Sequence, residues 1–317
     1  MLNLSGLREQ DMMVPDDFKW IHNAYWEPKI ISTQDSSHIL VKLYRRIHRH
    51  ILVMGEKNIS LNFLKILLNV DNTSDTNPGT KSKFGICLSD LESADTMSMK
   101  FAEKVCTDRV IQGLAENVPN SEGMILYLKI MKAVQIAFIS PQTAPAERMY
   151  YSYWILLICR IWRFSLTDDR NLKSFISSNT YNSIELNCQG MLCYLKKCRE
   201  RNEPHLFLPE LIGSQMCESF FRLERSQTTT YCTKTNFDIF EFLGRVKRTH
   251  VLMMSKANCG DFKIAREAKN NLSIPPTTLP SNDEILKIIE NALKDAFCEF
   301  SKLGEFKKGR LIFYNIL

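Results

Sequence analysis

Two carboxylates stand out because of the residues around them. Asp35 lies between a short β-branched run and a long basic segment, and Glu218 lies in the segment QMCESFFR at residues 215–222. Helical spacing places Glu218 on one polar face with Gln215 and Arg222. Two carboxylates from distant parts of a chain can share a divalent metal ion, which activates water or a 3′-hydroxyl for attack on a phosphodiester bond. The pair therefore indicates metal-dependent chemistry on a nucleic-acid backbone, with Asp35 and Glu218 as catalytic residues and metal ligands.

A structural interpretation of the same carboxylates stands beside the chemical one. Asp35 precedes a helical pattern and can cap its first turn, because a carboxylate accepts hydrogen bonds from the N–H groups there. Glu218 and Arg222 have the spacing of an ion pair on a helix surface. His38, one turn into the first helix, also has two interpretations: contact with DNA or metal, or capping and packing.

Basic side chains accompany both carboxylates. Between Asp35 and Glu56 the chain contains no acidic residue. The basic residues that we expect to contact DNA phosphates are Lys42, Arg45, Arg46, Arg49, Arg222 and Arg225. For the residues of the first helix, the alternative is a solvated basic face that contacts no ligand.

A strand and a helix are the elements that would position Asp35. The run at residues 29–34 is short and β-branched, which predicts a strand that ends at the carboxylate. From Ser36 onward, apolar residues recur every four positions, which predicts an amphipathic helix that Ser36 and Ser37 can cap. The sequence therefore predicts a strand, a carboxylate and then a basic amphipathic helix.

The rest of the chain is predicted to be mostly helical. Apolar periodicity, bounded by Pro, Gly and capping residues, predicts helices at 59–70, 95–117, 121–139, 147–164, 181–197, 214–223, from 235 onward and at 283–303. The side chains expected to face inward in the helix from residue 235 are Phe237, Phe240, Leu243 and Val246. The aromatic helix at 147–164 is predicted to be core, with a base-stacking surface as the alternative.

Composition and charge narrow the class of protein. The chain has 317 residues, of which 44% are hydrophobic and 24% charged, and a formal net charge of +6. These shares are near globular averages, and the length corresponds to roughly two domains. No apolar run reaches the roughly 18 residues of a membrane-spanning helix, so we expect no membrane partner. Ten cysteines without a Cys-x2-Cys pair predict structural thiols rather than a zinc site.

The segments around both carboxylates resemble those of a known family. GSQMCESFFR at 213–222, followed by TNF at 235–237 and EFL at 241–243, is similar to a late segment of P element-type (THAP-domain family) DNA transposases. In that family this helix carries the last carboxylate of an RNase H-like catalytic triad. ISTQDSSHILVKL at 31–43 is similar to the family's Asp-x-x-His-Leu-x-Lys segment, in which the aspartate is the second triad carboxylate.

The resemblance implies an α-rich α/β fold, in which a partial RNase H-like core is interrupted by a large all-helical insertion domain. It places the partial core in residues 1–54 and the insertion in 55–209. The final catalytic helix and the helix after it then occupy 210–255, and a linker and C-terminal helix occupy 256–317. In the P element the insertion binds a guanine nucleotide, so the resemblance implies GTP as well as Mg²⁺ or Mn²⁺.

The activity implied by the resemblance is DNA cleavage and strand transfer in the nucleus, with transposon-end DNA and further copies of the chain as partners. The first triad aspartate should lie several elements before Asp35, whereas Asp11, Asp16 and Asp17 lie close to it. We therefore expect an N-terminally truncated or domesticated transposase-like chain that is inactive alone. Met216 stands where many relatives have an acid.

Two alternatives come from other functional classes. A non-enzymatic nuclear binding module would use the basic helix to hold nucleic acid or an acidic protein, and its binding would be indifferent to Mg²⁺ and to Asp35. A helical scaffold would instead dock another protein through the aromatic segment at 150–164.

Overall fold

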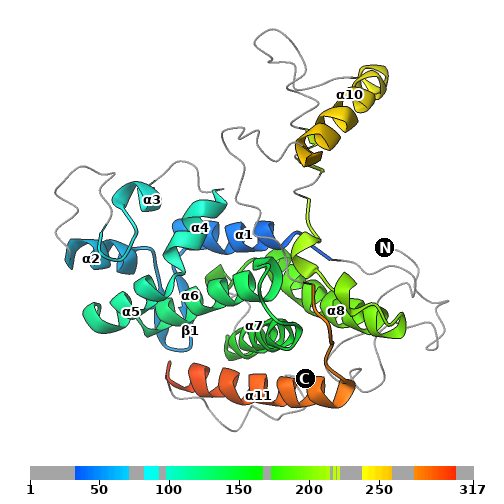
Figure 1. Cartoon of the computed structure of the whole chain (residues 1–317). Coiled ribbons are helices and arrows are strands. Elements are labelled where there is room, and N and C mark those ends of the chain that lie inside the picture. Colours follow the sequence, from blue (N-terminus) through cyan, green and yellow to red (C-terminus); the bar gives the residue numbers. More distant parts are fainter. Residues whose placement is uncertain are drawn as a thin grey trace. The chain divides into compact units, whose positions relative to one another are not determined.

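The structure is a computed structural model that describes residues 33–70, 82–92, 98–166, 173–214, 217–218, 220–221, 238–258 and 275–304. The chain divides into two compact units. The first comprises Met1–Leu211 with Ser273–Leu317, and the second comprises Ile212–Leu272. Figure 1 shows the elements of each unit, coloured in chain order.

In the described residues of the first unit, the regular elements are helices apart from one hairpin. Its elements are α1 (Ser36–Arg49), β1 (Leu52–Met54), β2 (Lys57–Ile59), α2 (Asn62–Val70), α3 (Leu88–Glu92), α4 (Met99–Val105), α5 (Asp108–Asn117), α6 (Glu122–Val134), the π-helix η3 (Gln135–Ile139), α7 (Pro145–Ser165), α8 (Ser178–Glu200), the 3-10 helices η5 (Pro204–Leu206) and η6 (Pro209–Leu211), and α11 (Asn282–Ser301). The α-rich class expected from the sequence is confirmed for the described residues. None of the described helices combines the length and apolarity that crossing a membrane requires.

α1 forms because apolar residues recur on one side of it and Asp35 caps its first turn. Leu43 and Ile47 are buried, as their four-residue spacing predicted. The helix packs against α4, α6 and α8, and the Tyr127 hydroxyl donates a 2.8 Å hydrogen bond to the carbonyl of Leu43. Because these helices cover its apolar stripe, α1 belongs to the same compact unit as the helices that follow it.

A two-stranded hairpin follows α1 where no strand was expected. β1 and β2 pair antiparallel, and Gly55 opens the two-residue turn between them with a φ of 61°. A glycine with positive φ at this position is typical of tight hairpins. The indole N–H of Trp162 donates a 2.6 Å hydrogen bond to the carbonyl of Val53, which ties the hairpin to α7. The helix expected from residue 59 therefore begins only at Asn62.

α7 lies at the centre of the core of the first unit, in contact with α6, α8 and α11 (Figure 1). Tyr153 and Trp162 are fully buried. The Trp162 ring meets Tyr127 and Phe175 edge to face, with centroid distances of 6.2 and 4.7 Å. The core interpretation of the aromatic helix is therefore confirmed. Burial of these rings leaves few side chains of 150–164 for base stacking or for docking a partner.

The single helix expected at 95–117 is two helices in the structure. Residues 93–97 lie outside the described ranges, and the helical path breaks between Cys106 and Thr107. The carbonyl of Thr107 then accepts the N–H of Val110 at 3.1 Å to begin α5. The break lets α5 turn its apolar side toward α2 and α6, so packing against two neighbours overrides the continuous periodicity.

A buried arginine closes the end of α6 and its π-helix. Arg148 of α7 donates a 3.0 Å hydrogen bond to the carbonyl of Ala137 and a 3.1 Å hydrogen bond to that of Thr143. It also forms a 2.7 Å ion pair with Glu210, and the two side chains are 3% and 5% exposed. Carbonyls in the last turn of a helix lack partners within the helix. The guanidinium provides such a partner for the carbonyl of Ala137. The ion pair with Glu210 also joins α7 to η6, which is the last short helix before the second unit in the sequence.

The second unit contains α10 (Ile239–Asn258) and a helical turn that includes Glu218. The carboxylate of Asp238 accepts the backbone N–H of Glu241 at 2.8 Å, so Asp238 supplies the cap of α10. The cap expected from the sequence, Thr235, lies outside the described residues. The acceptor geometry of an Asx side chain explains why the helix starts after Asp238.

The apolar side of α10 is partly open to solvent. Phe240 is 81% exposed and Leu243 is 59% exposed. The expectation that both face inward is therefore wrong, and Phe237 lies outside the described residues. Periodicity marks the side chains of a helix that share a face, but a neighbouring element must be present to bury that face.

Candidate functional site

The carboxylate of Asp35 is held at the start of α1. Its Oδ1 accepts the backbone N–H of Ser37 at 2.8 Å and that of His38 at 3.4 Å, and its carbonyl accepts the N–H of Ile39 at 3.2 Å. These contacts make Asp35 the N-cap of the helix, rather than Ser36 or Ser37. The capping interpretation of Asp35 is thus confirmed, and the side chain is only 10% exposed.

The chain immediately before α1 is held by a residue from a distant helix. Residues 29–32 of the expected strand lie outside the described residues, and Thr33 and Gln34 belong to no strand. The side chain of Asn187, in α8, instead accepts the N–H of Gln34 at 2.6 Å and donates to its carbonyl at 2.8 Å. Asn187 thereby satisfies both backbone groups of the residue before Asp35, as a paired strand would.

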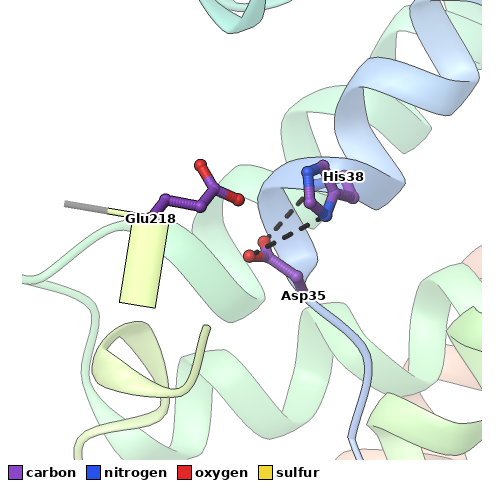
Figure 2. A group of neighbouring side chains, drawn as sticks. All are labelled: Asp35, His38 and Glu218. Carbon is purple, nitrogen blue, oxygen red and sulfur yellow. Dashed lines mark hydrogen bonds and ion pairs between the residues drawn. The ribbon is translucent and has the colours of Figure 1, made fainter. Parts of the chain in front are cut away.

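His38 follows one turn after Asp35. Its Nδ1 lies 3.9 Å from Oδ2 of Asp35, and the imidazole is about half exposed, at 49%. Figure 2 shows the two side chains side by side at the start of α1, with dashed lines for these contacts. One oxygen and one nitrogen ligand atom therefore lie together. Carboxylate oxygens suit Mg²⁺ and Mn²⁺, while imidazole favours transition metals, so Mn²⁺ fits this pair better than Mg²⁺.

Glu218, also drawn in Figure 2, belongs to the second unit. Its backbone N–H donates to the carbonyl of Ser214 at 2.8 Å, and its Oε1 accepts the Ser214 hydroxyl at 2.6 Å. The side chain is exposed, as a ligand for an ion in solvent must be. Gln215, Met216 and Arg222 lie outside the described residues, so the expected pairing of Glu218 with Arg222 stays a prediction.

The basic residues of α1 differ in what they contact. Arg46 donates through Nε to the carbonyl of Phe175 at 3.0 Å and through Nη2 to that of Lys173 at 2.7 Å. Burial lowers the pKa of this guanidinium from its usual range. Arg46 therefore joins α1 to the chain before α8, which leaves fewer of its donors for a phosphate.

The other expected DNA contacts on α1 differ in how exposed they are. Arg49 is exposed, and Lys42 and Arg45 are half-buried. Arg222 and Arg225 lie outside the described residues. Among the described members of this set, Arg49 is therefore the one with the most exposed side chain.

The described cysteines are consistent with structural thiols. All eight of them are free, and the regular trio on α8 is buried. Burial raises the pKa of Cys188 to about 12 and that of Cys193 to about 11. A zinc ligand must be a thiolate, and burial opposes loss of the proton. Cys198, the third member, also has its pKa raised by burial.

Asn187 is the residue of this site that the sequence did not reveal. It occupies an ordinary polar position in a predicted helix, and 153 positions separate it from Gln34. No short-range pattern links the two segments. Only the contact between α1 and α8 brings this amide to the backbone beside Asp35.

No protein-family model, curated protein or solved structure matches this chain. The transposase resemblance therefore rests on the two sequence segments in which it was found. We therefore argue a functional proposal for this chain from the local geometry at the start of α1 and at Glu218.

Proposed function

We propose that this chain is a nuclear, P element-like, transposase-derived protein that binds DNA through a divalent metal ion. Asp35 and Glu218 would be the metal ligands, and His38 would supply a nitrogen ligand. The observation that carries the proposal is the capped carboxylate of Asp35, which lies beside His38 at the start of a helix that contains no acid. When bound, such an ion polarises phosphodiester oxygens and can activate water.

The residues of the chain have separate tasks in this proposal. Asp35 uses Oδ1 to cap the helix, and its Oδ2 lies 3.9 Å from Nδ1 of His38. Glu218 presents its carboxylate from an exposed helical turn. Lys42, Arg45 and Arg49 would neutralise phosphates along the helix, which makes the affinity dependent on salt. Arg222 and Arg225 remain proposed DNA contacts by resemblance, as GTP remains a proposed cofactor.

The test measures binding of a fluorescently labelled DNA duplex by anisotropy, with Mn²⁺, with Mg²⁺ and with chelator. We expect Mn²⁺ to strengthen binding more than Mg²⁺. Asp35→Asn and Glu218→Gln should each reduce the metal-dependent gain in DNA affinity by at least about 10-fold. Loss of an outer-shell partner already lowers metal affinity by that factor, and a direct ligand should matter at least as much. Asn keeps an oxygen that can cap the helix, so Asp35→Asn tests ligation rather than folding.

Glu116→Gln is the matched control, because Glu116 is an exposed carboxylate on α5. It should retain the full response to metal. Equal affinities with Mn²⁺ and with chelator in the wild type would overturn the proposal.

A non-enzymatic binding module is the second candidate, and one observation favours it. Asp35 already has a structural role as the cap of α1, which accounts for a carboxylate at this position without a metal ion. This candidate predicts DNA binding that weakens with salt and is unchanged by Asp35→Asn. Arg49→Gln should weaken binding in both candidates, since Arg49 is exposed on the basic helix.

A further inference from the structure

Asn187 directs both its amide oxygen and its amide nitrogen toward the residues that flank Asp35. Its oxygen accepts from the N–H of Gln34, and its nitrogen donates to the carbonyl of Gln34 and, at 3.1 Å, to the hydroxyl of Ser36. The side chain is buried, with a residue exposure of 3%. One amide thus holds the residue before Asp35 and the residue after it.

The arrangement has a consequence for the carboxylate between them. The oxygen that caps the helix fixes one side of the Asp35 carboxylate, and the hydrogen bonds to Gln34 and Ser36 restrain the backbone from which it projects. A ligand on a restrained backbone loses little conformational entropy when it binds. Outer-shell partners that orient ligands typically account for 10- to 100-fold in metal affinity.

We propose that Asn187 is the positioning residue for the metal-binding carboxylate of Asp35. This role rests on the proposed function. The same hydrogen bonds join the start of α1 to α8 whether or not metal is bound. The position of Asp35, the candidate ligand, is therefore set by α8. Asn187 itself does not contact the ion.

The experiment uses the full chain and Mn²⁺ alone as the probe, with affinity measured from the electron paramagnetic resonance signal of free Mn²⁺. We expect Asn187→Ala to weaken binding by about 10- to 100-fold. Ser36→Ala removes one of the three hydrogen bonds and should weaken binding less. Amide hydrogen exchange at Ser37 gives a second readout, because its N–H donates to Asp35 only while the cap is held.

Tyr127→Phe is the control for a purely structural effect. It removes a buried hydrogen bond to the carbonyl of Leu43 on the same helix, two turns from Asp35. We expect it to lower the free energy of unfolding without changing Mn²⁺ affinity or exchange at Ser37. Should Asn187→Ala fail to fold, Ser36→Ala carries the comparison, since it removes one hydrogen bond of Asn187 and leaves the two to Gln34.

The outcomes separate the two proposals. Wild-type affinity for Mn²⁺ in Asn187→Ala, with faster exchange at Ser37, would overturn the positioning role and leave the proposed function standing. Equal affinities in Tyr127→Phe and Asn187→Ala would likewise reduce Asn187 to a structural contact. Wild-type protein that binds no Mn²⁺ would overturn the proposed function and this role with it.

Discussion

Several buried polar side chains among the described residues of the first unit are held by ion pairs or hydrogen bonds. Asp90 is the clearest case, with a side chain only 2% exposed and a 2.5 Å ion pair to Lys104. Its Oδ2 accepts the backbone N–H and the thiol of Cys87, both at 3.0 Å. Burial by itself raises the pKa of Asp90, but the hydrogen bonds from Lys104 and Cys87 outweigh it and hold the pKa below its usual value of 3.8.

We expect Asp90→Asn to lower the free energy of unfolding at neutral pH by about 1–2 kcal/mol, because hydrogen bonds to a charged group are lost while Lys104 remains partly hydrated. Because the pKa of Asp90 is lower in the folded chain than in the unfolded chain, the ionised carboxylate stabilises the fold. This contribution to the free energy of unfolding is complete at pH values above the unfolded pKa. That contribution is lost as the pH falls from 3.8 toward the folded pKa. Urea unfolding of wild type and Asp90→Asn near pH 7 and about pH 3 should therefore show a difference that shrinks in acid. A constant difference would show that ionisation of Asp90 does not stabilise the fold.

At the scale of elements, close contacts between backbones decide where helices can meet. Gly123 lies in the first turn of α6, against the hairpin. A Cβ at this position would lie 2.9 Å from the Cβ of Lys57 and 3.1 Å from the carbonyl oxygen of Asn58. Backbone atoms cannot move aside cheaply, so the packing of α6 on β2 requires a glycine here.

The same substitution in two helices tests this requirement. Gly123→Ala should lower the melting temperature, since strain of typically 1–3 kcal/mol exceeds the gain of up to about 1 kcal/mol in helix propensity. Gly244→Ala on α10 has nothing within 4 Å of the added Cβ and should be neutral or stabilising. Thermal unfolding followed by circular dichroism measures both. An increase in melting temperature for Gly123→Ala would show that the hairpin yields to α6.

At the scale of the whole molecule, the first unit is completed by a helix from the far end of the chain. α11 packs along α7, and its Ile289 is fully buried. The hydroxyl of Tyr150 donates a 2.6 Å hydrogen bond to Asp295, and Lys129 forms a 2.7 Å ion pair with Glu299. Contacts between such distant segments make the folding of the unit depend on its C-terminal helix.

We expect Ile289→Ala to lower the free energy of unfolding by about 2–5 kcal/mol, the range for truncation of a large buried side chain. The matched control is Glu290→Ala, an exposed neighbour that should change stability by less than about 0.5 kcal/mol. Urea unfolding followed by tryptophan fluorescence reports the transition, because Trp162 lies in the same core. Equal effects of the two variants would mean that α11 is not part of the cooperative unit.

Local patterns in the sequence determined the features that depend on a few neighbouring residues. The apolar spacing from Ile39 to Ile47 specifies α1, and the aromatic segment specifies the buried helix α7. The capping role of Asp35 also follows from its place before a helix. Such signals suffice because one turn of helix contains both the side chain and the backbone groups that it serves.

The tertiary structure alone decided which distant groups meet. Asn187 reaches the residues beside Asp35 across 153 positions, and Arg46 is tied to carbonyls before α8 rather than left on a solvated face. Conversely, the apolar residue Phe240 remains exposed although its spacing predicted burial. Burial and long-range hydrogen bonds depend on the elements that pack against a residue, and that packing minimises a free energy summed over the whole chain. A periodic pattern identifies a face, whereas only the fold determines what covers it.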